Sequence, residues 1–373
     1  MNGLVFLRLG AWLFGLAAVA SLWATPDLGA SLPWVIQTVL GAALVLAGAE
    51  WARRAPGDRS SRYATRLLDA YLAGGWVVLA VMLLGTRWPT YKLSFLSSVY
   101  GALPSIRSLP LGFFAQGVPP NQAGGILATF VAFSLAPALR RLPPRNEPGA
   151  LRRQHVVGAR TLAAGGSLVV FMTGSRAALA AIMAALAVLL IARNRRWLWA
   201  TAGLAGAGAV AAALDPSLLG HVLGLFLRDE TLETKLVARL DIWSSVLAGI
   251  QDHAFTGIGL GVLNEVLPAR YPYKSVGLSF TVTHAHNVFL DTALTLGLPG
   301  LLAMVCLFVG MSLLVFKEGM RQSPERTVAV GIMGAAIAFL VFGFTDSLSL
   351  STPSSAFLWL WASTLPLVGK RGT

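Results

Sequence analysis

Long apolar segments recur along almost the whole chain, and they restrict the fold more than any other feature. A membrane-spanning helix needs about 20 predominantly apolar residues. The segments that meet this requirement are residues 4–24, 33–50, 67–86, 122–139, 156–173, 177–192, 197–214, 285–316, 327–345 and 355–369. Only 12% of the residues are charged, whereas soluble proteins have about 25%. The sequence therefore predicts an all-α, polytopic transmembrane helical bundle.

The basic residues indicate how these spans are oriented. The net charge of +13 would by itself be compatible with nucleic-acid binding. The basic residues, however, are concentrated in the connections at 51–66, 140–155, 193–196, 317–326 and 370–373. Positively charged loops stay in the cytoplasm. We therefore expect both termini in the cytoplasm and no nucleic-acid partner.

The first apolar segment has an alternative interpretation. Arg8, the apolar stretch after it and Ala18-Val19-Ala20 are similar to a secretory signal peptide with a small-residue cleavage site. We expect an uncleaved first span instead, because a second apolar segment follows at once and needs a partner that crosses outward.

Two connections are long enough to have structure of their own. Residues 87–121 suggest an irregular loop with a short interfacial helix. Residues 215–284 are expected to form a loop with amphipathic helices on the non-cytoplasmic side, between transmembrane helices over 1–214 (about seven spans) and over 285–373. Within this loop, Leu227–Val246 has apolar residues at helical spacing, which predicts an amphipathic helix along the membrane surface.

Two other features exclude common kinds of site. The glycine-rich segment 257–261 ends the predicted amphipathic helix, but no Gly-Lys-Ser/Thr follows it and no strand precedes it, so it is not a nucleotide phosphate loop. The single cysteine, Cys306, lies in an apolar segment, which excludes an intramolecular disulfide and a cysteine metal cluster.

A histidine motif lies where the large loop enters a predicted span. It reads Thr283-His284-Ala285-His286-Asn287, and Gly297-Leu298-Pro299-Gly300 follows after nine residues. A helix break at the Gly/Pro motif is tolerated where it lines a cavity, and His286 would face that cavity. Alternatively, His286-Asn287 only caps the helix and the glycines only permit close packing. The residues by themselves leave both interpretations open.

Two arginine motifs lie in segments that are expected to be external. Gly174-Ser175-Arg176 joins two spans, where Arg176 either binds an anion or reaches toward lipid headgroups. Arg239-Leu240-Asp241-Ile242-Trp243 lies on the predicted amphipathic helix. There Arg239 either binds a substrate or only pairs with Asp241 or Glu233.

Together, these motifs resemble the O-antigen ligase and polymerase superfamily of bacterial envelope glycan enzymes, over roughly residues 160–310. The residues that match the ligase pattern are His286, Asn287, Gly297 and Gly300, with Gly-Ser-Arg at 174–176, Arg-x-x-x-Trp at 239–243 and the glycine-rich segment after it. The resemblance implies a GT-C-like bundle of about 10–12 spans. Ligases usually have twelve, so two spans are either missing or hidden in 87–121 or 215–284.

The resemblance also implies a function. It indicates a bacterial inner-membrane enzyme with a periplasmic active site, which transfers O-antigen glycan from undecaprenyl diphosphate to lipid A-core in lipopolysaccharide biosynthesis, with inversion. Arg176 and Arg239 would bind the diphosphate, because guanidinium groups bind phosphate oxygens bidentately. His286 would accept the proton of the acceptor hydroxyl. The expected supporting residues are His284, Asn287, Asp291, Gly297 and Gly300.

The supporting residues have simpler interpretations as well. His284 would point away from His286 on a helix, although in an extended segment both rings reach one cavity. Asn287 and Asp291 would orient substrate hydroxyls or His286, or form only a local polar pair.

No metal or other cofactor is expected. A catalytic zinc needs three protein ligands and a supporting shell, for which the sequence offers His284, His286 and Asp291. The first external loop, where many metal-dependent lipid-linked glycosyltransferases carry acidic ligands, has only Asp27.

Other functions remain open at this point. An O-antigen polymerase or a protein O-oligosaccharyltransferase would use the same donor with another acceptor. A secondary transporter or flippase would bind its substrate at the broken helix. Transporters of this kind usually show paired breaks in two related halves, and the sequence has one such break and no internal repeat.

Overall fold

The computed structural model describes residues 3–54, 60–90, 93–104, 117–142, 152–194, 196–197, 199, 203, 232–273, 282–317, 323–346 and 348–368. This part of the chain is 82% helical and has no strand. Seven of its helices are long and apolar enough to cross a membrane. The predicted all-α, polytopic transmembrane bundle is thereby confirmed.

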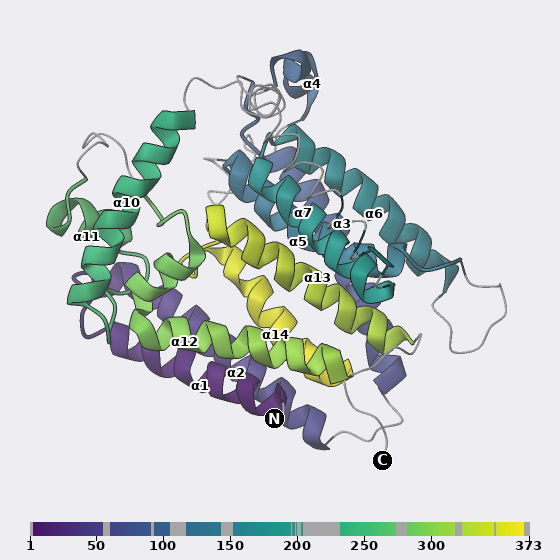
Figure 1. Cartoon of the computed structure of the whole chain (residues 1–373), viewed down its shortest axis with the longest axis horizontal. Helices are drawn as coiled ribbons and strands as arrows, with labels where there is room; N and C mark the ends of the chain where they lie inside the picture. Colours follow the sequence, from purple (N-terminus) through teal and green to yellow (C-terminus); the bar gives the residue numbers. More distant parts are fainter. Residues whose placement is uncertain are drawn as a thin grey trace.

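The long helices coincide with the expected spans (Figure 1). The seven membrane-length helices are α1 (Gly3–Ser21), α2 (Leu28–Arg54), α3 (Ser60–Gly85), α6 (Arg153–Met172), α7 (Arg176–Arg193), α12 (Val288–Lys317) and α13 (Pro324–Thr345). Two more expected spans are the helices α5 (Pro120–Ala138), which is polar in its first turn, and α14 (Ala356–Val368), which is shorter. The remaining expected span, 197–214, falls almost entirely outside the described residues.

The remaining described elements lie in the connections between the spans. They are η2 (Ser94–Leu96), α4 (Ser97–Ala102), α10 (Leu232–Asp252), α11 (Leu263–Arg270) and η5 (Pro353–Ser355). Helix α4 is the short helix predicted within 87–121. It packs on the bundle, because the Tyr100 hydroxyl donates a hydrogen bond of 2.7 Å to the Met172 carbonyl and its ring stacks on Trp88.

The interior of the bundle is built on α5 and α13, which contact each other and both contact α7. Phe133 of α5 and Phe339 of α13 are among its largest fully buried side chains. Large apolar side chains on the outer helices instead point outward, for example Leu16 (62% exposed) and Met183 (68% exposed). Apolar side chains on the outside and the inside alike are the pattern of a helix bundle surrounded by lipid.

One end of the bundle carries most of the arginines that the sequence places in basic connections. We call it the arginine end; it includes Arg53, Arg140, Arg193 and Arg326 at the termini of α2, α5, α7 and α13. The start of α1 lies there too, because Gly3 packs against Gly310 and Leu314 near the end of α12. Helix α14 also ends there, since it runs beside α2 toward Arg53. That this end faces the cytoplasm stays a prediction.

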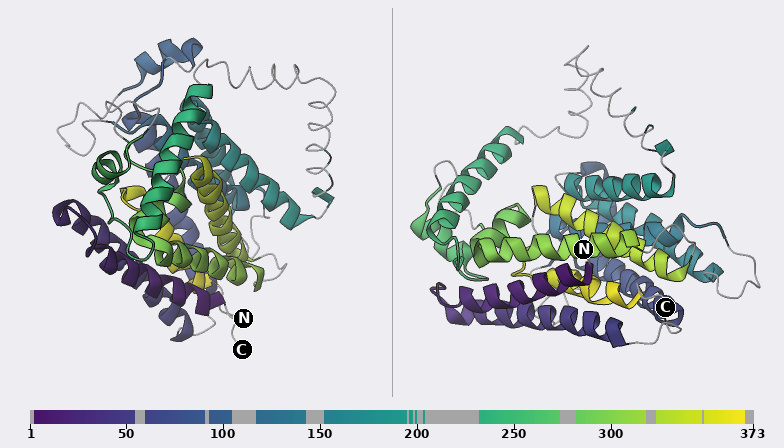
Figure 2. Two further views of the ribbon diagram at one scale, coloured as in Figure 1. Left: turned by 60° about the vertical axis from the view of Figure 1, so that its left-hand side comes forward. Right: turned by 60° about the horizontal axis from the view of Figure 1, so that its bottom comes forward.

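Helices α10 and α11 form a small second core against the start of α12 (green in Figure 2). Ile242, Val246 and Leu267 pack there against Ala285 and Leu294. Helix α10 continues beyond the predicted periodic stretch to Asp252, before the glycine-rich segment that was expected to end it, and residues 227–231 lie outside the described part of the chain. The reason is that its apolar face continues as well: Ile250 packs on the same core.

Helix α12 is broken at Gly297, as the sequence predicts. Gly297 has φ 70° and ψ −178°, a conformation open essentially to glycine alone. The glycine-rich segment supplies the backbone partners that the break exposes. Ile258 N donates to the Leu294 carbonyl (2.9 Å), Gly259 N to the Thr295 carbonyl (3.2 Å), and Leu298 N to the Ala254 carbonyl (2.7 Å). The glycine-rich segment 257–261 and the Gly/Pro motif therefore together determine the backbone of α12 at its break.

Replacement of Gly297 by alanine is expected to destabilise the protein by about 2 kcal/mol or more, because a non-glycine residue is strained in this conformation. The added Cβ would also lie only 2.8 Å from the backbone oxygens of Ala254 and Phe255. Thermal unfolding in neutral detergent measures this effect. Gly74→Ala on α3 is the matched control, since its Cβ would meet nothing within 4 Å. Equal unfolding temperatures for Gly297→Ala and Gly74→Ala would contradict the prediction.

Candidate active site

Asn287 connects the histidine motif to the start of α12 and to the end of α13. Its side-chain oxygen accepts hydrogen bonds from Phe289 N (2.9 Å) and Leu290 N (3.1 Å), as a helix cap does. Its amide donates to the Phe344 carbonyl near the end of α13 (3.2 Å). The cap interpretation of Asn287 is therefore right, and the same side chain brings the end of α13 beside the histidines.

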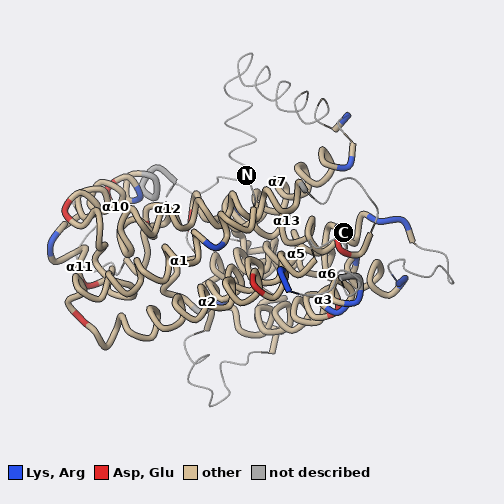
Figure 3. The backbone as a smooth tube through the Cα atoms, turned by 90° about the horizontal axis from the view of Figure 1, so that it is seen from below, with Lys and Arg blue, Asp and Glu red and all other residues tan. Residues whose placement is uncertain are grey.

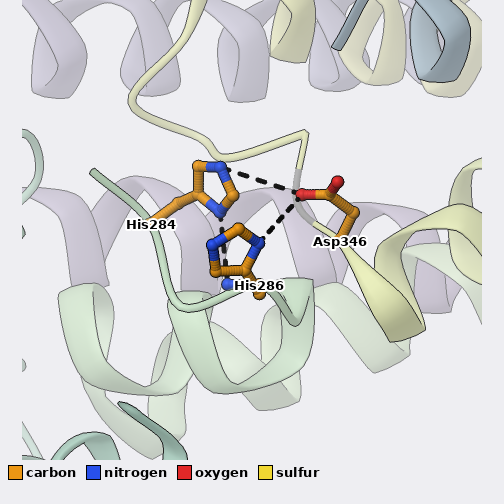
Figure 4. Close-up of side chains that lie close together, drawn as sticks. All are labelled: His284, His286 and Asp346. Carbon is orange, nitrogen blue, oxygen red and sulfur yellow. Dashed lines mark hydrogen bonds and ion pairs between the residues drawn. The ribbon is translucent and has the colours of Figure 1, made fainter. Parts of the chain in front are cut away.

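Both histidines lie in the segment before α12, and their rings face one carboxylate (Figure 4). The ring centroids of His284 and His286 are 4.3 Å apart. Asp346 Oδ1 lies 3.3 Å from His286 Nδ1 and 3.8 Å from His284 Nε2. The non-helical segment before α12 therefore brings His284 and His286 together, whereas a helix would separate them.

A hydrogen bond to its ring indicates where the proton of His284 lies. The backbone N–H of His286 donates to His284 Nδ1 (3.2 Å), so a neutral His284 carries its proton on Nε2. Burial lowers the pKa of His284, and the neighbouring His286 lowers it further. This lowered pKa favours the neutral form of His284, although the charges of Asp346 and Asp291 act to raise it. A proton on His286 Nδ1 would face Asp346, which leaves the lone pair of His286 Nε2 for a substrate.

The backbone of His286 is strained. Its φ is +50°, a value that few residues other than glycine adopt. Such strain costs about 1–3 kcal/mol and persists only where the surrounding contacts hold it. Residues of this kind occur often at active sites, which makes His286 the strongest candidate for a chemical role in the described segments.

Asp346 is the site residue that the sequence reasoning missed. It follows the last residue of α13 and is buried, with 4% of its surface exposed. Its Oδ2 accepts a hydrogen bond from the Asn121 side chain at the start of α5 (3.1 Å). The available signal was an acidic residue directly after an apolar span, at the start of a connection with almost no positive charge. Nothing in that signal points to the histidines, which are far away in sequence.

Asp291 supports the histidine motif from within α12. Its Oδ1 accepts a hydrogen bond from Ala285 N (3.0 Å) and its Oδ2 accepts one from the Ser349 hydroxyl (2.7 Å). It is 1% exposed. Because Ala285 lies between the two histidines, this carboxylate holds the backbone that carries both rings.

The Arg239 motif reaches the same segment through Trp243. The Trp243 indole N–H donates to the Ala285 carbonyl (2.9 Å), which ties α10 to the histidine motif. Arg239 lies one helical turn before Trp243 and is partly exposed. After burial and His286, the charge of Arg239 also acts to lower the pKa of His284. The guanidinium therefore lies close enough to act on the histidine cluster.

Arg176 is the first residue of α7, at the end of the bundle opposite the arginine end. The turn that precedes it packs closely on α5: a Cβ at Gly124 would lie 2.8 Å from Thr173 Oγ1. Asn121, the partner of Asp346, lies one helical turn earlier on α5. The first turn of α5 thus links the Gly-Ser-Arg motif to the carboxylate that faces both histidines.

The segment that carries most of this site matches a known sequence family. Residues 161–305 match the sequence family described as O-antigen ligase. The predicted resemblance to the O-antigen ligase family is confirmed. The matched residues include Arg176, Arg239, His286 and the break at Gly297, whereas Asn121 and Asp346 lie outside them. The match supports a membrane glycosyltransferase of the O-antigen ligase and polymerase group. No curated protein matches it in sequence.

One part of this ligase-family site offers possible metal ligands. One donor atom from each of His284, His286 and Asp346 lies within 4.8 Å of the others. Asp291, the third ligand considered from sequence, is instead bound to Ala285 and Ser349. The charge of Arg239 acts on the same cluster and opposes the binding of a cation. Metal independence stays a prediction, and chelation tests it.

Proposed function

We propose that this chain transfers an O-antigen glycan from undecaprenyl diphosphate to a hydroxyl group of lipid A-core. The reaction takes place on the periplasmic side of the bacterial inner membrane, needs no metal and inverts the anomeric carbon. The observation that carries the proposal is the pair His286 and Asp346, 3.3 Å apart, beside the Arg-x-x-x-Trp helix of a ligase-family region. A base with a carboxylate partner next to a phosphate-binding group suits this transfer.

The proposed step is a single displacement. The oxygen of the acceptor hydroxyl attacks the anomeric carbon, and the bond from that carbon to the diphosphate oxygen breaks. His286 Nε2 accepts the hydroxyl proton, and Asp346 stabilises the imidazolium that forms, as a carboxylate does for a catalytic histidine. The glycan leaves the lipid carrier with inversion, and undecaprenyl diphosphate departs with the bonding electrons.

The arginines have the complementary task in this proposal. Negative charge grows on the diphosphate oxygen as the bond breaks. Arg176 and Arg239 bind the diphosphate and stabilise this charge, because a guanidinium stays protonated and forms two parallel hydrogen bonds to phosphate oxygens. Two guanidinium groups would supply the positive charge for this step without a divalent cation.

Transfer by the purified protein from undecaprenyl-diphosphate glycan to lipid A-core tests the proposal. We expect wild-type transfer to continue in excess chelator, and Arg176→Ala to lose roughly 100-fold or more of it, as happens when a charged group that stabilises a transition state is removed. Arg87→Ala, at the same end of the bundle after α3, is the matched control and should keep wild-type transfer. Transfer that stops in chelator and returns with Zn²⁺ would contradict metal independence.

The products also distinguish the acceptor. No transfer to lipid A-core by folded protein that binds the donor would contradict the ligase assignment. A polymer of glycan repeats, or a glycosylated protein, would then show a polymerase or a protein O-oligosaccharyltransferase.

A further inference from the structure

The arginine end of the bundle contains a cavity that the proposed reaction does not use. It has a volume of about 580 Å³ and lies between the end of α5, the end of α7 and the start of α13. The other ends of these helices lie at the end of the bundle that carries the histidine cluster: Asn121 lies in the first turn of α5, Arg176 starts α7 and Asp346 follows α13. The cavity and the candidate active site are therefore separated by the length of these helices. A helix of 19 residues, such as α5, is about 28 Å long.

Positive charge dominates the lining of this cavity. Arg140, Arg141, Arg193 and Arg326 line it, and no acidic side chain does so among the described residues. Figure 3 shows blue Lys and Arg positions gathered near the C-terminus of the chain, at this end of the bundle. Burial lowers the pKa of Arg140, and the charges of Arg326 and Arg193 lower it further. Like charges held this close repel one another, and a bound anion would relieve that repulsion.

Helix capping explains some of the arginines at this end but not the cavity. The Arg193 guanidinium donates to the Leu139 carbonyl, and Arg160 donates to the carbonyls of Ala138 and Arg140 (both 3.0 Å). These bonds satisfy carbonyl groups at the C-terminus of α5, as basic side chains often do. Arg160, however, does not line the cavity, whereas Arg140 and Arg326 do.

Apart from Thr327, the remaining lining is apolar. Leu139, Leu189 and Val330 line the cavity beside the arginines. A site with several guanidinium groups beside apolar side chains, at the ends of membrane-spanning helices, matches a ligand with a phosphate group attached to a hydrocarbon chain. Basic pockets between transmembrane helices bind the headgroups of anionic lipids in this way.

We propose that this cavity is a binding site for the phosphate group of an anionic membrane lipid, at the end of the bundle opposite the candidate active site. The arginines hold the phosphate oxygens, and the apolar side chains contact the first part of the acyl chains. The ligand is taken from the membrane leaflet at the arginine end. A soluble phosphate compound shares the same chemistry, so the test must distinguish the two sources.

The test uses the full chain in neutral detergent, with mixed micelles that contain either phosphatidylglycerol or zwitterionic phosphatidylcholine. We expect phosphatidylglycerol to raise the unfolding temperature in a saturable way and phosphatidylcholine to have little effect. The double variant Arg140→Gln/Arg326→Gln should bind phosphatidylglycerol at least about tenfold more weakly, because each basic residue adds attraction for anionic lipid. Arg62→Gln, an exposed arginine at the same end on α3, is the matched control and should bind normally.

Further results distinguish the loss of an anion site from a folding defect, and a lipid phosphate from a soluble one. Arg326→Lys keeps the charge and should keep most of the binding, which separates the loss of an anion site from a general folding defect. Equal stabilisation of wild type and the double variant by phosphatidylglycerol would overturn the proposal. Inorganic phosphate that protects wild type as well as phosphatidylglycerol does would overturn the lipid as the source of the phosphate.

Discussion

His286→Ala is expected to lower the turnover of glycan transfer by roughly 10²–10⁴-fold, the usual contribution of a positioned general base. The acceptor hydroxyl would then have to lose its proton to water. The surrounding residues remain in place in this variant, because Asn287 still caps α12 and Asp291 still holds Ala285 N. The initial rate of transfer to lipid A-core, at saturating donor, measures the effect.

Two further variants make this result specific. An alanine at this position would retain the strained backbone, so His286→Asn is the better test of chemistry, since asparagine adopts positive φ more readily. It should be as inactive as His286→Ala. His253→Ala is the matched control: His253 lies in the turn after α10, outside the cluster, and its loss should leave turnover unchanged. An active His286→Asn enzyme would remove His286 from the role of base.

Asp346→Asn is expected to lower turnover by roughly 100-fold or more while the KM values for donor and acceptor stay within a few fold. The substitution keeps the shape of the side chain, and the new amide oxygen can still accept the hydrogen bond from Asn121. It removes the negative charge that lies 3.3 Å from His286 Nδ1. The imidazolium formed during transfer then loses its counter-charge, so the loss appears in turnover rather than in binding.

The control for Asp346→Asn removes the charge of a carboxylate that lies outside the histidine cluster. Asp27 caps the start of α2 through the Ala30 N–H (3.0 Å) and lies outside the histidine cluster, so Asp27→Asn should retain turnover. Asp346→Glu restores the charge and should recover part of the rate. If Asp346→Asn transfers glycan at the wild-type rate, Asp346 only supports the fold and His286 acts without a carboxylate partner.

The chain's local sequence was sufficient for most of the fold. Nine of the ten expected spans coincide with helices, because membrane insertion depends on how apolar each segment of about 20 residues is. Two other local features were also readable. Asn287 precedes a long apolar segment and caps it, and Gly297 stands where only glycine tolerates the backbone. The family resemblance rested on motifs of this local kind.

What local sequence could not show is which polar side chains meet. Asp346 faces the histidines because Asn287 ties the start of α12 to the end of α13, and Asn121 arrives from α5. The role of Asp291 likewise depends on Ser349, which lies in the connection before α14. These contacts join separate helices, and their geometry follows from how the helices pack rather than from any short pattern. The sequence by itself thus determined the spans, the cap and the break, whereas tertiary packing alone placed the carboxylate beside the histidines and the arginines around the cavity.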